Sequence, residues 1–257
     1  MATLKEKVDL YNGKVSIDFY PVSHQYRKDG KVIDSVSSIT GLIDKSKPLM
    51  LWAERIAREY IEEVVREGED ISISHVETAI TLHRARKEEG AQVGTAVHDW
   101  ITEWISLTPK KRTQMEMPTD TQVLNGIIAF LSWAKGGKIK FVESERLVYS
   151  KKYNYVGRMD NAFYVGKSKS LVIGDFKTSK HVGVEAILQA VGYAIAYAEE
   201  TGAEVSGLAI QHFNKEDGSF RVYNFEFEDI LIKGFLALNE AKKSIKRANQ
   251  IINQLKK

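Results

Sequence analysis

The segment Gly157–Lys180 reads GRMDNAFYVGKSKSLVIGDFKTSK and sets a few charged residues among apolar ones. Two runs in and beside it, Val156–Val165 and Ser170–Phe176, are rich in the β-branched and aromatic residues that strands prefer. The residues between them, Gly166–Lys169, are short and polar, as in a tight turn. The segment therefore predicts a β-hairpin.

Two carboxylates oppose each other in this predicted hairpin. If the turn is centred between Lys167 and Ser168, Asp160 lies directly across from Asp175. Opposed residues have Cβ atoms about 4.5–5.5 Å apart, and like charges at that separation repel. A bound cation is a common reason for such a pair inside apolar strands. The alternative interpretation is that Asp160 ends a strand and Asp175 belongs to a surface ion pair.

Lys177 adds an amine to the two carboxylates. It follows Asp175 by two residues, so the two side chains share one face of the strand. Mg²⁺ prefers oxygen ligands, and a metal-bound water beside a lysine suits attack on a phosphodiester. The lysine can orient or deprotonate that water, or stabilise the developing charge.

Further motifs on both sides of the hairpin resemble the PD-(D/E)XK nuclease superfamily, in its RecB-like branch. In chain order the matching motifs are Gly94–His98 (GTAVH), Glu145, Gly157–Asp160, Asp175–Lys177 and Gln189–Tyr193 (QAVGY). Near the start, His24–Tyr26, Asp29–Lys31, Ser35–Ser37 and Trp52 resemble the opening of phage and mitochondrial-genome-maintenance-type exonucleases. The resemblance extends from about residue 23 to residue 197.

The resemblance implies a fold and an activity. The fold is an α/β (mixed α+β) restriction-endonuclease-like core, in which helices flank a central mixed β-sheet, preceded by an N-terminal helical region. The activity is Mg²⁺- or Mn²⁺-dependent hydrolysis of DNA phosphodiesters, most often at DNA ends in replication, recombination or repair. One or two ions would be held by His98, Asp160, Asp175 and the Phe176 carbonyl, with Lys177 assisting the water and Glu145 in an outer-shell or second-metal role.

Other residues near the motifs are candidates for contact with DNA. The residues concerned are Arg158, Thr178, Lys180, Gln189 and Tyr193. Phosphate contacts from such side chains position a substrate without reading its sequence. Gln189 and Tyr193 are four residues apart on a predicted helix and share a face. The alternative for Tyr193 is packing in the core, and that for His98 is a structural or surface histidine.

Two rival functions remain open. One is a structure-specific or restriction-type endonuclease on the same core, and the other is a catalytically silent DNA-binding scaffold subunit. Gly166-Lys167-Ser168 resembles the end of a phosphate-binding P-loop, but Asn161 stands where that motif requires glycine. Any helicase activity therefore needs a partner, and a helicase or recombination protein is the expected one. We expect a phage or mobile-element origin.

Composition is that of an ordinary globular protein. The 257 residues carry a net charge of +3 and contain no cysteine. The lack of cysteine excludes disulfides and an iron–sulfur cluster, and fits a cytoplasmic location. Residues 1–7 do not resemble a signal peptide, and no apolar run reaches the length of a membrane span. We therefore expect no membrane partner.

The chain divides into an N-terminal β-hairpin and helical region (1–137), which contributes one metal-site helix, and a nuclease core (138–257), joined in one compact unit. Glycines at 90 and 94 are expected to interrupt the helical stretch 74–107, and the basic segment 108–118 to form a mobile loop. The final helix, about 229–255, ends in a basic cluster. This cluster is either a solvated face or a surface that follows DNA phosphates.

Overall fold

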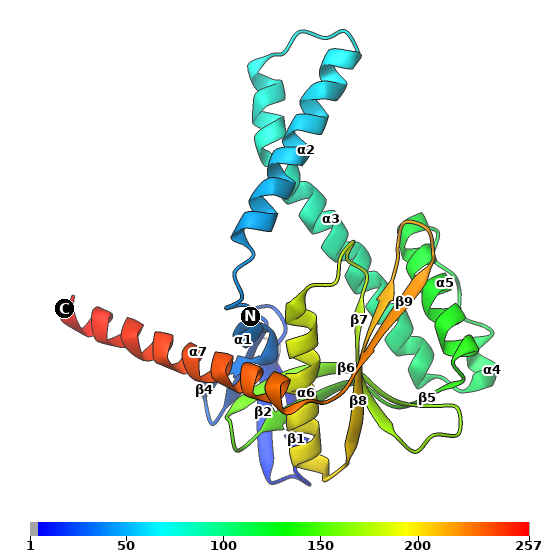
Figure 1. Ribbon diagram of the computed structural model, residues 1–257, viewed down its shortest axis with the longest axis vertical. Coiled ribbons are helices and arrows are strands. Elements are labelled where there is room, and N and C mark those ends of the chain that lie inside the picture. The colour runs from blue at the N-terminus through cyan, green and yellow to red at the C-terminus, as the bar shows by residue number, and fades with distance from the viewer. Residues whose placement is uncertain (1–4, 257) are drawn as a thin grey trace.

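The predicted hairpin consists of strands β6 (Tyr155–Val165) and β7 (Leu171–Lys177) in the computed structural model, which describes residues 5–256. Asn161 pairs with Gly174 and Phe163 with Val172. This register confirms the turn centre expected from the sequence. The hairpin lies in the middle of a nine-stranded mixed sheet (Figure 1).

The neighbours of the hairpin complete the predicted mixed α/β fold. Strand β5 (Ile139–Ser150) runs antiparallel along the whole of β6, and β8 (Val205–Phe213) runs parallel to β7. Helix α6 (Val184–Thr201) makes the crossover that a parallel pair requires. Strand β9 (Phe220–Phe225) closes this side of the sheet antiparallel to β8.

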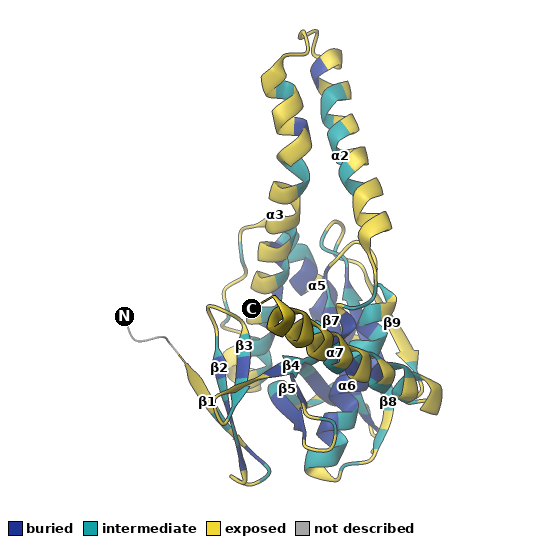
Figure 2. Cartoon of the chain, turned by 90° about the vertical axis from the view of Figure 1, so that its left-hand side faces the viewer, coloured by how far each residue is buried: buried dark blue, intermediate teal, exposed yellow. Residues whose placement is uncertain are grey.

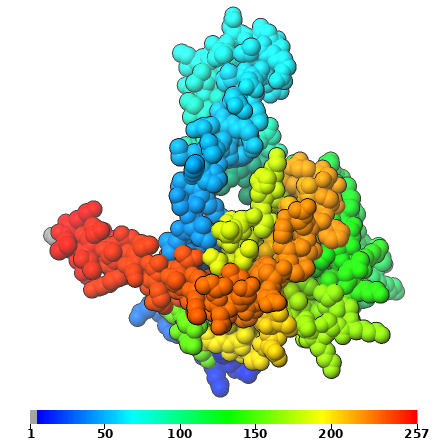
Figure 3. Space-filling model, viewed as in Figure 1, coloured from blue at the N-terminus to red at the C-terminus, as the bar shows by residue number. Residues whose placement is uncertain are grey.

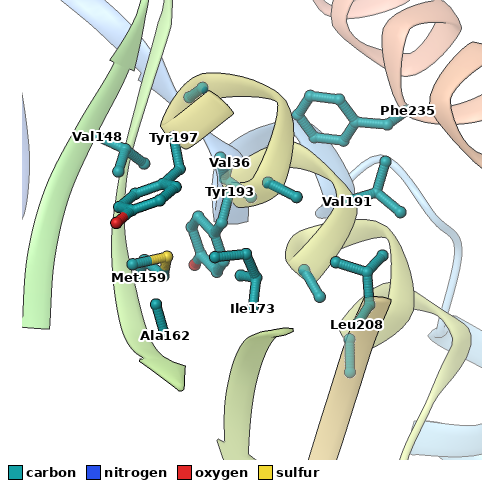
Figure 4. Close-up of a cluster of buried hydrophobic side chains, with 14 of the residues drawn as sticks. Val36, Val148, Met159, Ala162, Ile173, Val191, Tyr193, Tyr197, Leu208 and Phe235 are labelled. Carbon is teal, nitrogen blue, oxygen red and sulfur yellow. The ribbon is translucent and has the colours of Figure 1, made fainter. Parts of the chain in front are cut away.

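Helices cover both faces of this core sheet. Helix α6 packs on one face with α1 (Val36–Thr40) and the first half of α7 (Asp229–Leu255). Figure 4 shows Tyr193 and Tyr197 of α6 among the aliphatic side chains of that core. Helices α3 (Ile73–Ser106) and α5 (Thr121–Gly136) cover the other face over a buried cluster of aromatic rings.

Four N-terminal strands extend the sheet. They are β1 (Glu6–Leu10), β2 (Val15–Tyr20), β3 (Gln25–Lys28) and β4 (Lys31–Ser35). The predicted Asp29-Gly30 turn joins β3 to β4. Strand β4 then pairs in parallel with the first two residues of β6, 155 and 156. Between these residues and the β6–β7 ladder, residues 157–160 have no strand partner on that side of β6 among the described residues.

Helix α3 corrects one expectation. It runs without a break through Gly90 and Gly94, where an interruption was predicted. A Cβ on Gly94 would lie 3.1 Å from Thr178 Oγ1, so the glycine lets α3 approach the end of β7 closely. A glycine inside a helix costs only about 1 kcal/mol, which packing readily offsets. With α2 (Ser46–Arg66), the first part of α3 forms a helical arm (residues 46–90) that projects from the body (Figure 1).

The basic segment 108–118 is anchored, in contrast to the mobile loop expected. It begins with a short helix, α4 (Pro109–Arg112). The Arg112 guanidinium lies 4.0 Å from the Trp104 ring centroid and donates hydrogen bonds to the carbonyls of Trp104 and Ile105. The Trp100 indole donates to the Glu116 carbonyl at 3.0 Å. Across residues 5–256, none of the helices combines the length and apolar character that crossing a bilayer demands.

Candidate active site

Three carboxylates lie on three adjacent strands. Ser144 pairs with Asn161 and Arg146 with Met159, so Glu145 of β5 is opposite Asp160 of β6. On the other side of β6, the hairpin register places Asp175 of β7 next to Asp160. Asp160 is therefore the middle of the three, at the end of the stretch of β6 that lacks a second strand partner.

His98 reaches this group from α3. One ligand atom from each of His98, Glu145 and Asp160 lies within 4.8 Å of the others. The His98 Nε2 is 3.2 Å from the Phe176 carbonyl, and its Nδ1 is 3.8 Å from Asp160 Oδ2. A carbonyl only accepts hydrogen bonds, so Nε2 carries the proton in this contact. A neutral imidazole then has a free lone pair on Nδ1, which faces the carboxylates.

The main chain of Phe176 forms hydrogen bonds with two members of this group, Asp160 and His98. Its N–H donates to Asp160 Oδ2 at 2.7 Å, while its carbonyl accepts from His98. Histidines that bind metals commonly donate their second ring N–H to such a carbonyl, which fixes the ring orientation. In this arrangement the Phe176 carbonyl accepts a hydrogen bond from His98, and its role as a metal ligand stays a prediction.

Glu145 is held under strain. It has a left-handed φ of +51° inside β5, which is unfavourable for a residue with a side chain. Burial, followed by repulsion from Asp160, raises the pKa of the Glu145 carboxyl to about 7. Two acidic side chains that repel each other beside a histidine make a set of ligands suited to Mg²⁺ or Mn²⁺. The residues present therefore fit a divalent cation.

Asp175 takes a different partner. Its carboxylate, 2% exposed, forms an ion pair with the Lys177 ammonium. Burial alone would lower the pKa of Lys177, but the carboxylates of Asp175 and Asp160 outweigh it and raise that pKa. The ammonium also donates to Gln189 Oε1 at 3.4 Å, and Gln189 donates to Thr40 Oγ1 at 3.2 Å. Glu145, and not Asp175, thus completes the carboxylate–histidine group.

The remaining candidates lie around the same cavity, with different exposures. Tyr193 is 7% exposed and packs in the core, where a Cβ on Gly157 would lie 2.6 Å from its ring. Arg158 donates to Glu6 at 3.1 Å and to the Glu145 carbonyl at 3.3 Å. Thr178 is 8% exposed, whereas Lys180 is open to solvent.

The cavity has a volume of about 850 Å³, and the helical arm lines one side of it. Leu49 and Trp52 of α2 and Arg86 and Lys87 of α3 line it opposite the carboxylates. Figure 3 shows the molecule hollowed between the arm and the segment that follows β7. Arg86 and Lys87 were missed because the helix was expected to break at Gly90. An unbroken helix places Lys87, Gly94 and His98 along one face.

Comparisons with known proteins give only distant matches. No protein-family model matches the chain, and no curated protein was found to be similar. Two solved structures of the alkaline exonuclease LHK-Exo from Laribacter hongkongensis are similar at 12% and 14% identity, the second in complex with dAMP. They cover 59% and 61% of this chain and 91% and 93% of their own, with TM-scores of 0.30 and 0.31. The function is therefore inferred from the residues of this chain.

Proposed function

We propose that this protein is a metal-dependent deoxyribonuclease that hydrolyses phosphodiester bonds at DNA ends. The observation that carries the proposal is the convergence of His98, Glu145 and Asp160 beside the Asp175–Lys177 ion pair in one open cavity. Carboxylates, an imidazole and an ammonium together can bind a divalent cation and a phosphate. The cavity also has basic side chains on its far wall, which suits a polyanion.

Each residue has a distinct role in this proposal. Asp160, Glu145 and His98 Nδ1 hold one or two Mg²⁺ or Mn²⁺ ions, and Asp175 holds Lys177. A bound ion polarises a phosphoryl oxygen and acidifies water. Because its pKa is raised, Lys177 stays an ammonium at neutral pH. It therefore acts by donating hydrogen bonds to the phosphate or to the attacking water, which stabilises the charge that develops.

The helical arm favours action at ends. The arm lines the cavity across from the carboxylates with Leu49, Trp52, Arg86 and Lys87. A DNA strand bound in the site would therefore lie beneath the arm. A free end enters such a covered site more easily than the middle of a long strand. We infer that the arm selects ends, and that circular single-stranded DNA resists cleavage.

The proposal is tested by cleavage of end-labelled single- and double-stranded linear DNA with Mg²⁺, Mn²⁺ or EDTA. We expect stepwise shortening by the parent with metal only, and a loss of about 10²-fold or more in Lys177→Ala and Asp175→Ala. Lys167→Ala is the matched control, because Lys167 lies exposed in the turn at the other end of the same hairpin. Absence of cleavage with either metal, with DNA binding unchanged in both site variants, would leave the scaffold alternative. Opening of circular single strands would favour the endonuclease.

A further inference from the structure

The second half of α7 carries an apolar stripe that lies in solvent. Helix α7 buries Phe235 and Asn239 against the body, and its Lys246 ammonium still contacts the body, 2.7 Å from Asp34 Oδ1 of β4. The rest of the helix projects (Figures 1 and 2). Beyond Asn239, apolar residues recur at alternating spacings of four and three and so share one face of the helix. They are Ala241, Ile245, Ala248, Ile252 and Leu255. The three large side chains are 47%, 48% and 82% exposed. Such spacing is typical of a helix that packs on another helix.

A second exposed stripe lies on the helical arm. Ile73, Val76 and Ile80 of α3 have the same three-and-four spacing and are 79%, 44% and 62% exposed. Helix α2 packs on a different face of α3, where Ala79 is buried. The molecule thus presents two apolar helical stripes, a longer one on α7 and a shorter one on α3, each on a projecting element.

The surroundings of the two stripes have opposite charge. Between Glu59 and Glu77, the tip of the arm has seven acidic residues and one basic residue, Arg66, and two of the acids pair with Arg55 and Arg58 of α2. Between Glu240 and Leu255, helix α7 has four basic residues and one acidic residue, and Lys256 follows its end. Among the described residues, Lys242 and Arg247 have no ion-pair partner, whereas Lys243 and Lys246 pair with Glu240 and Asp34. Lys257 lies outside the described residues. Opposite potentials on matching surfaces favour association and orient it.

We propose that α7 of one copy of this protein docks on the α3 stripe (Ile73, Val76 and Ile80) of a second copy. Pairing of α7 with α7 would bring two basic helices together, which costs free energy. DNA would satisfy the lysines of α7 but leave its isoleucines in water, and the acidic tip of the arm (residues 59–77) would repel it. Only the α7–α3 contact covers both stripes and pairs their charges.

The contact is heterologous, since it joins two different surfaces. Every copy offers one α7 and one arm, so the contact repeats from copy to copy and produces a ring or an open chain. The stripe on α3 is in line with the cavity. Residues seven apart share a face of the helix, and this spacing links Ile73 and Ile80 to Lys87 and Gly94, which line the cavity. The docked helix would therefore lie on the side of the arm that leads to the cavity.

Complementation between two variants tests this contact. Ile252→Asp breaks the α7 stripe, and Ile80→Lys breaks the arm stripe. Both residues are exposed, so both variants should fold, which circular dichroism checks. In sedimentation velocity without metal or DNA, we expect the parent to associate as its concentration rises, and less at high salt. Each variant alone should be monomeric. Their equimolar mixture should form a one-to-one dimer, in which the intact α7 of Ile80→Lys docks on the intact arm of Ile252→Asp.

The control is Gln250→Asp, on the face of α7 opposite the stripe, which should associate as the parent does. A monomeric parent at the highest concentration would overturn the proposal. Self-association of Ile80→Lys alone would overturn it in favour of α7–α7 pairing. A monomeric parent whose DNA affinity falls in Ile252→Asp would identify α7 as a DNA contact instead. None of these results depends on nuclease activity.

Discussion

His98 and Asp160 are tied to each other through one peptide unit. The Phe176 carbonyl accepts from His98 Nε2 at 3.2 Å, and the Phe176 N–H donates to Asp160 at 2.7 Å. Phe176 lies between Asp175 and Lys177, so the same short stretch of β7 positions four side chains of the site. The ring of Phe176 is buried in the aromatic core, which makes this stretch rigid. Preorganisation of this kind is what a metal site requires.

The raised pKa of Glu145 leads to a prediction for the metal-free protein. The unfolded chain releases this proton near pH 4.5, while the folded protein retains it up to about pH 7. Between these values the folded state binds more protons, so the free energy of unfolding falls as the pH rises. In Glu145→Gln, we expect the free energy of unfolding to fall less steeply with pH. The difference in unfolding free energy between the parent and the variant should change by at most about 1.4 kcal/mol per pH unit. Urea unfolding in EDTA between pH 4.5 and 8 measures the difference, and parallel curves for the two proteins would contradict the assignment.

At the scale of elements, the partners of β6 create the site. Strand β5 pairs with β6 along its full length, but on the other edge β4 occupies only its start and β7 only its end. The uncovered stretch, residues 157–160, opens into the cavity. Gly157 allows Tyr193 of α6 to pack against this stretch. The site is therefore an interruption in an otherwise continuous sheet.

The two glycines of α3 lead to a second prediction at this scale. A Cβ at position 90 would meet only the flexible end of Lys215, at 3.5 Å, whereas one at position 94 would meet Thr178 Oγ1 at 3.1 Å. We expect Gly90→Ala to stabilise the protein by about 0.5–1 kcal/mol through helix propensity. Gly94→Ala should gain less or lose stability, because α3 is pushed from the end of β7.

Thermal unfolding of the two variants measures this difference, with each serving as the control for the other. Nuclease activity should fall in Gly94→Ala alone, since the same displacement moves His98 from Asp160. Equal stabilisation in both variants, with activity intact, would show that the close approach of α3 is not needed.

At the scale of the whole molecule, a mixed sheet carries two projecting helical elements (Figure 1). The arm lines the cavity, and α7 projects from the body in a different direction from the arm (Figure 1). Both are mostly exposed, in contrast to the buried sheet (Figure 2). The sheet carries Glu145, Asp160, Asp175 and Lys177, while the arm lines the same cavity with Leu49, Trp52, Arg86 and Lys87.

Covering of the cavity by the arm leads to a prediction about substrates. Linear single-stranded DNA with a bulky protein bound at both ends should resist degradation, because neither end can pass beneath the arm. The same strand with one free end should be shortened from that end. Denaturing gels of strands labelled in the middle measure this difference. Equal degradation of doubly blocked and free strands would show that strands enter from the side.

The hairpin, its register and the helices around it were predictable from local patterns. Alternation of apolar residues and a polar turn of known centre determine which residues of β6 and β7 are opposed. The resemblance of short motifs identified His98, Glu145, Asp160 and Lys177 as candidates. The hairpin depends on residues close together in the chain, where spacing sets the geometry, whereas His98 and Glu145 came from the family resemblance alone.

Other features were decided by contacts between distant parts of the chain. The close approach of α3 to the end of β7 at Gly94 depends on Thr178, and the basic wall at Arg86 and Lys87 depends on the continuity of α3. The grouping of Glu145 with His98 and Asp160, and the pairing of Asp175 with Lys177, depend on the left-handed backbone at Glu145 and on which carboxylate Lys177 contacts. Residue spacing carries no information on these choices, because each is a competition between packing and charge that exists only in the folded protein.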